Sequence, residues 1–144
     1  MDDIDQITAD VLDVCLPVHR ELGPGLLESV YETVLAGKLT QMGHFVERQK
    51  AVDIEFEGLR FDSAFRIDLL VDRRVIVEIK STERLNAAHS KQLLTYLRLT
   101  KLSVGLLINF AGATLKEGVK RIVNNHLDSA SPRLRVNNRL PAAY

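Results

Sequence analysis

Apolar side chains recur at helical spacing in the first third of the chain. Residues 4–20 place them every three or four positions, which predicts a helix with one buried stripe. The run Gly23-Pro24-Gly25 then interrupts, because proline cannot continue a helix interior and glycine adopts unusual dihedral angles. A second helix is predicted from about residue 27 to residue 42, ended by Gly43, with the stripe Leu27, Val30, Tyr31, Val34, Leu35 and Leu39.

The middle of the chain changes to the alternating pattern of β-strands. Two short strands are expected at residues 45–50 and 51–57, followed by strands at 65–71 and 75–81 that flank a tight turn. Helical spacing returns at residues 86–100, and the near-continuous apolar run at 103–110 suits a strand buried on both faces. Residues 115–123 fit a strand or a helix, and the pattern does not decide between them.

This order of elements predicts an α/β (α+β) fold in which helices flank one mixed sheet, with the order α-α-β-β-β-β-α-β-(β). The 144 residues suffice for a single core. We expect one domain over residues 1–127. A polar, loosely held C-terminal tail is expected over residues 128–144 because the composition there turns polar and includes prolines.

Composition excludes several classes of protein. No run of eighteen apolar residues is present, and the acidic start is unlike a secretory signal, so we expect a cytoplasmic protein. Cys15 is the only cysteine, which rules out an internal disulfide and a cysteine-based zinc site. The formal net charge is zero. Neutrality counts against tight non-specific binding of nucleic acid, but acidic metal ligands would lower the charge of a nuclease in the same way.

Charged residues in the strands at 65–71 and 75–81 are the candidate active-site residues. Strand alternation puts Glu78 and Lys80 on one face, and it points Asp68 away from its apolar neighbours. If residues 72–74 form the loop, Asp68 pairs with Glu78 and Arg66 with Lys80. Two adjacent carboxylates repel each other unless a cation lies between them.

A divalent cation is one occupant that fits this arrangement. Mg²⁺ and Mn²⁺ prefer oxygen ligands, commonly one or two carboxylates together with water and a substrate phosphate. From these residues alone, a half-exposed sheet face carrying a carboxylate–lysine pair explains the pattern equally well.

Three motifs in order add a resemblance to a known family. Asp68 followed by Glu78-Ile79-Lys80 resembles the D-x(n)-E-x-K signature of the PD-(D/E)xK nuclease superfamily. Residues 25–31 form a G-x-x-E-x-x-Y motif, and residues 92–96 form a Q-x-x-x-Y motif. Together they look like the GxxExxY family, a small branch of that superfamily, over roughly residues 4–124.

The resemblance implies a restriction-endonuclease-like core and a role for each matching residue. Asp68, Glu78 and the backbone carbonyl of Ile79 would bind Mg²⁺ or Mn²⁺, and Lys80 would act on the attacking water. Glu28 would complete the site directly or through water. The remaining matches are Gln92 as a further catalytic-site residue, with Tyr31 and Tyr96 as supporting residues.

We therefore expect a metal-dependent nuclease acting on DNA, or alternatively on RNA. Two other interpretations remain open: a catalytically silent nuclease-fold module that binds nucleic acid or a partner protein, and a subunit active only within a larger defence or repair complex. A homodimer or a partner protein would suit a chain of one small domain. No membrane association is expected.

Overall fold

Two helices begin the fold as their apolar stripes predict. The computed structural model describes residues 3–125 and the backbone of residues 134–137. Helix α1 spans Asp3–Leu22 and helix α2 spans Glu28–Gln41. Gly23 and Gly25 separate the helices at φ of 75° and 97°, a backbone conformation that side chains with a Cβ rarely adopt. The interruption expected at this point is therefore confirmed.

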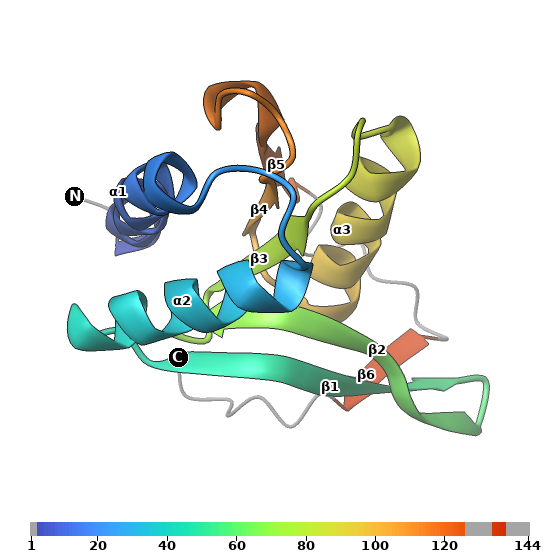
Figure 1. Ribbon diagram of the computed structural model, residues 1–144. Coiled ribbons are helices and arrows are strands. Elements are labelled where there is room, and N and C mark those ends of the chain that lie inside the picture. The colour runs from blue at the N-terminus through green and yellow to red at the C-terminus, as the bar shows by residue number, and fades with distance from the viewer. Residues whose placement is uncertain (1–2, 126–133, 138–144) are drawn as a thin grey trace.

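A six-stranded mixed sheet forms the centre of the fold (Figure 1). Its strands lie in the order β5-β4-β3-β2-β1-β6. Strands β3 and β4 are parallel, and helix α3 (Ala87–Thr100) connects them, whereas the other neighbouring strands are antiparallel. The mixed sheet with flanking helices confirms the expected fold class. The bounds are β1 Val46–Phe56, β2 Leu59–Val71, β3 Val75–Lys80, β4 Val104–Asn109, β5 Val119–Val123 and β6 Leu134–Asn137.

Helices cover both faces of the sheet. Helices α1 and α2 pack on one face, around Val11, Tyr31, Leu35, Val77 and Ile108. Helix α3 packs on the other face through Leu93 and Leu97, against Ile67, Leu70, Ile76 and Leu107. Strands β3 and β4 are thus buried from both sides, which is why their sequences are almost continuously apolar.

Four expected elements differ from the structure. The strand expected at residues 65–71 begins earlier, at Leu59. The two short strands expected at residues 45–50 and 51–57 are one strand, β1, with a positive φ at Gln49 and a register shift between Val52 and Ile54 rather than a break. The undecided segment 115–123 contains a 3₁₀ turn (Lys116–Gly118) followed by β5. Within the expected tail, Leu134–Asn137 form β6 against β1. The other residues of the segment 128–144 lie outside the described part of the chain.

Strand alternation is interrupted where β1 and β2 cross the centre of the sheet. Ile67 and Leu69 should share a face, yet Ile67 packs in the α3 cluster and Leu69 in the α1–α2 cluster. The pair that lies between them, Gln49 opposite Asp68, is missing from a ladder that otherwise keeps one register from Val46 to Val52, and Gln49 has a φ of 48°. The expectation that Asp68 points away from apolar neighbours on one common face is therefore wrong for Ile67, because the side-chain alternation of the hairpin changes at Asp68.

A half-buried histidine, His44, ties the first helix to the turn between β2 and β3. The His44 Nδ1 atom lies 2.5 Å from an oxygen of Asp72, and Nε2 lies 2.7 Å from an oxygen of Asp10 on α1. Burial lowers the pKa of His44, but the hydrogen bonds and charges of the two aspartates outweigh it and raise the pKa above 6.5. A protonated His44 therefore bridges both carboxylates.

Two further features concern the helices and the single cysteine of the described residues. No helix among them is long and apolar enough to cross a membrane. Cys15 is buried in α1, and burial raises the pKa of its thiol to about 12. The thiol is therefore held in its unreactive form, as expected for a core cysteine.

Candidate active site

The three-residue turn sets the predicted hairpin register. Val71 faces Val75, Leu70 faces Ile76 and Leu69 faces Val77, after which the ladder ends. The pairs expected to follow, Asp68 with Glu78 and Arg66 with Lys80, are not part of the ladder. The two strands diverge there, which opens a fork at the carboxyl end of β3.

Two carboxylates replace backbone hydrogen bonds in this fork. The Asp68 backbone N–H donates to Glu78 Oε2 at 2.8 Å, and the Ile79 backbone N–H donates to Asp68 Oδ2 at 2.8 Å. Each carboxylate is thereby fixed by the strand that carries the other. One oxygen of each accepts from a backbone amide. The second oxygen of Glu78 remains available for a further ligand, and Asp68 Oδ1, which accepts from the Gln49 amide at 3.3 Å, keeps a lone pair for one. The two acidic groups come together as the sequence predicted, through this exchange.

Burial disfavours two negative charges on the neighbouring Asp68 and Glu78 side chains. Glu78 is only 4% exposed, and burial followed by the charge of Asp68 raises its pKa to about 8. Burial also raises the pKa of Asp68, although the Ile79 hydrogen bond opposes the change. At neutral pH the metal-free site therefore retains a proton on Glu78. A cation that displaced this proton would relieve the repulsion.

Lys80 and the Ile79 carbonyl lie at the same strand end. The positive charge of Lys80 lowers the pKa of both Asp68 and Glu78, so the ammonium group lies within electrostatic reach of them. The Lys80 carbonyl accepts from Phe110 N on the β4 side. The N–H and C=O of one strand residue point to the same side, so the Ile79 carbonyl opens toward the fork, where its N–H already points.

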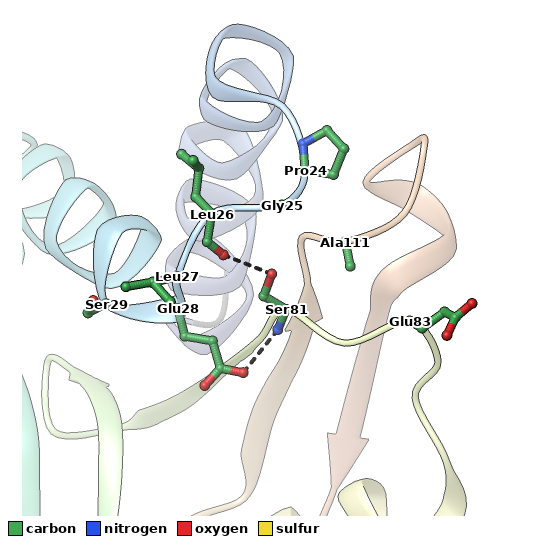
Figure 2. A pocket seen from close by; sticks show the side chains of 9 residues that line it. All are labelled: Pro24, Gly25, Leu26, Leu27, Glu28, Ser29, Ser81, Glu83 and Ala111. Carbon is green, nitrogen blue, oxygen red and sulfur yellow. Dashed lines mark hydrogen bonds between the residues drawn. The ribbon is translucent and has the colours of Figure 1, made fainter.

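Glu28 joins the site from the first turn of α2. Its Oε2 accepts from the Ser81 backbone N–H at 3.0 Å, and the Ser81 hydroxyl donates to the Leu26 carbonyl at 3.0 Å (Figure 2). The loop before α2 is thus attached to the residue that follows Lys80. The charge of Glu28 also raises the pKa of Glu78, so it is a third carboxylate in the field of the fork.

Tyr31 holds the loop that precedes Glu28. Its hydroxyl donates to the Gly23 carbonyl at 2.6 Å and accepts from the Leu26 N–H at 3.2 Å. Its ring is fully buried and stacks on Phe110 at 4.3 Å between centroids. These contacts agree with a supporting role rather than a chemical one, because the hydroxyl is committed to the backbone.

A pocket of about 760 Å³ opens beside Glu28 (Figure 2). Its walls come from the loop before α2, the segment after β3 and the segment after β4. The lining residues are Pro24, Gly25, Leu26, Leu27, Glu28, Ser29, Ser81, Glu83 and Ala111. The pocket adjoins the acidic fork through Glu28 and Ser81.

Helix α3 contributes one of its two expected residues to the neighbourhood of the carboxylates. Tyr96 is half-buried, and its ring stacks on Phe65 at 4.1 Å between centroids. Burial, then the charges of Glu78 and Asp68, raise the pKa of Tyr96, which places its phenol near both. Gln92 lies one turn earlier and is exposed. No hydrogen bond joins Gln92 to the other site residues in the described part of the chain.

Two residues of the site were not found by sequence reasoning. Glu32 on α2 is 6% exposed and accepts hydrogen bonds from Arg48 and from Gln49. The Gln49 amide also donates to Asp68 Oδ1 at 3.3 Å. Glu32 lies four residues after Glu28, on the same helix face, and this spacing was the available signal. Gln49 carried no signal, because its position depends on a strand irregularity.

The residues in the fork suit a hard divalent cation. They offer two carboxylates with lone pairs still available and a backbone carbonyl that opens toward them. Mg²⁺ and Mn²⁺ accept such a set when water and phosphate complete the shell. Burial and the charge of Asp68 raise the pKa of Glu78, and a divalent cation bound by both carboxylates would offset that repulsion. No group of three acidic, histidine or cysteine side chains within residues 3–125 is arranged to hold a metal alone. A metal ion in the fork would therefore also need the Ile79 carbonyl and water as ligands.

Comparison with known proteins agrees with the motifs. The family model described as the PD-(D/E)XK nuclease superfamily matches residues 5–122. This range includes the acidic fork, Lys80, Glu28 and helix α3. Curated proteins and solved structures give no significant match.

Proposed function

Because the chain belongs to the PD-(D/E)XK nuclease superfamily, we propose that it is a Mg²⁺- or Mn²⁺-dependent nuclease that hydrolyses phosphodiester bonds of DNA. The observation that carries the proposal is the buried exchange between Asp68 and Glu78 at the end of β3, beside Lys80. The G-x-x-E-x-x-Y and Q-x-x-x-Y motifs support membership of the GxxExxY branch.

In this proposal Asp68, Glu78 and the Ile79 carbonyl bind the cation, and Glu28 contributes directly or through water. The bound ion would supply Lewis-acid polarisation of the phosphate and a lowered pKa of water. The chain binds such a cation with a net release of protons at neutral pH, because Glu78 must lose its proton.

Lys80 is the residue that contacts the reacting atoms in this proposal. Its ammonium group can donate hydrogen bonds to the attacking water or to the phosphate oxygens, on which negative charge increases as the bond to the water forms. Glu28 is fixed by Ser81, and Tyr31 fixes the loop before it, so the wall of the 760 Å³ pocket is held in place for the nucleic-acid strand. Gln92 and Tyr96 are proposed to contact the nucleic-acid strand from α3, outside the residues that line this pocket.

A cleavage assay tests the function. Linear, circular, single-stranded and double-stranded DNA, with RNA in parallel, are incubated with the protein in Mg²⁺ or Mn²⁺, beside Lys80→Ala and a chelator control. Metal-dependent cleavage by the wild type that the variant lacks supports the proposal. Metal and nucleic-acid binding without cleavage would instead favour a silent binding module, or a subunit that needs a partner protein or a second copy.

A further inference from the structure

The irregular pair at the centre of the β1–β2 hairpin lies directly beside the acidic fork. Gln49 has a positive φ of 48° within a strand, which a residue with a Cβ seldom adopts. The Gln49–Asp68 pair is missing from the ladder, although the pairs directly before and after it, Arg48 with Leu69 and Lys50 with Ile67, keep the same register. Strained backbone of this kind persists only where the surrounding contacts hold it.

The contacts of the Gln49 side chain show what holds it. Its amide nitrogen donates to Glu32 Oε1 at 2.6 Å and to Asp68 Oδ1 at 3.3 Å. Glu32 is itself buried and held by Arg48, through Nε at 3.2 Å and Nη2 at 3.1 Å. A fixed carboxylate on α2 thus anchors the amide that reaches Asp68.

A glutamine suits this position for a chemical reason. One –NH₂ group has two protons, so it can serve two carboxylates at once without adding charge. A lysine there would neutralise the fork and compete with a cation, and a carboxylate would repel both neighbours. The amide instead fixes the orientation of Asp68 and leaves its negative charge in place.

We propose that Gln49, anchored by Glu32, is a positioning residue that orients Asp68 for the divalent cation. The inference rests on the proposed nuclease function, because it assumes that Asp68 binds a metal. Gln49 acts through Asp68. Partners that orient a metal ligand typically change metal affinity by about 10–100-fold when they are removed.

Gln49→Gly separates this role from a structural one. Glycine accepts the positive φ without strain, which offsets the hydrogen bond that Glu32 loses, so the metal-free variant should melt close to the wild-type temperature. It lacks the amide, so Mn²⁺ binding measured by calorimetry should weaken by about 10-fold or more. Gln49→Asn is the second variant: asparagine tolerates a positive φ, but its shorter side chain cannot span both carboxylates, and Mn²⁺ binding should weaken as in the glycine variant.

Ser63→Gly is the matched control. Ser63 is an exposed residue of β2 at φ 51°, and its backbone N–H donates to Asp53, a bond that glycine keeps. This variant relieves the same backbone strain away from the fork, and its Mn²⁺ affinity should equal that of the wild type. Wild-type Mn²⁺ affinity in both Gln49 variants would overturn the positioning role alone. Failure of the wild-type protein to bind Mn²⁺ at millimolar concentration would overturn the metal site and the inference with it.

Discussion

Glu78→Gln should make the metal-free protein more stable at alkaline pH. The amide oxygen of glutamine can still accept the Asp68 backbone N–H that Glu78 accepts in the wild type. Its –NH₂ group can donate to the Asp68 carboxylate, so repulsion is replaced by attraction. Alanine would be a poor choice, because it would leave the buried Asp68 N–H without this acceptor.

The size of the effect follows from the pKa of Glu78. Its carboxyl titrates at 4.5 when unfolded and at about 8 in the folded protein, mainly because of burial. Below pH 4.5 both states hold the proton, and between the two values only the folded state does. Unfolding free energy is therefore lost as pH rises through this window, by roughly 1.4 kcal/mol per pH unit and about 5 kcal/mol in full. That loss is a large part of the roughly 5–15 kcal/mol that stabilises a typical domain.

Urea unfolding in chelator between pH 5 and 9 measures the difference. Near pH 5 the wild type and Glu78→Gln should agree within about 1 kcal/mol, and by pH 8.5 the variant should be more stable by about 3–5 kcal/mol. The comparison cancels other titrating groups, His44 among them, because both proteins contain them. Added Mn²⁺ should restore the wild type and leave the variant almost unchanged.

A structural role for Glu78 leads to the opposite result. If the carboxylate were held by a favourable ion pair with Lys80, its removal would cost stability at every pH above 5. A variant that unfolds at lower urea concentration than the wild type at pH 8.5 would therefore refute the interpretation of the fork as a strained acidic pair.

Three other perturbations have defined outcomes. Lys80→Ala should bind Mn²⁺ and DNA with nearly wild-type affinity in calorimetry. Its single-turnover cleavage rate should fall by about two to three powers of ten, the scale of one lost charge-stabilising donor. A loss of metal binding instead would make Lys80 a structural residue. Mg²⁺ or Mn²⁺ at about 100 times its dissociation constant should raise the unfolding free energy by about 2.7 kcal/mol, and chelator should reverse the change. An unchanged melting temperature at saturating metal would contradict binding to the folded state. His44 has a raised pKa, so the stability from its bridge to the two aspartates is complete below pH 6.5 and is lost as pH rises through the folded pKa. The unfolding free energy of His44→Gln should lack this decline with pH. Parallel curves of unfolding free energy against pH for the two proteins would exclude the charged bridge.

Local patterns in the sequence determined most of the architecture. Helical spacing predicted α1, α2 and α3, and the three-residue turn at 72–74 predicted the register of β2 and β3. That register in turn predicted the meeting of Asp68 with Glu78. These features depend on spacing within one or two adjacent elements, where side-chain direction follows directly from helix or strand geometry.

Contacts between distant segments decided the rest. Gln49 reaches Asp68 only because β1 and β2 change their facing at the same pair, and Glu32 reaches Gln49 only because α2 packs across β1. His44 likewise bridges Asp72, which lies 28 positions later in the chain, and Asp10, which lies 34 positions earlier. No periodic pattern encodes such meetings, since each depends on how whole elements pack. The acidic pair is thus encoded in the hairpin, whereas the buried surroundings that raise the pKa of Glu78 to about 8 arise only when helices cover both faces of the sheet.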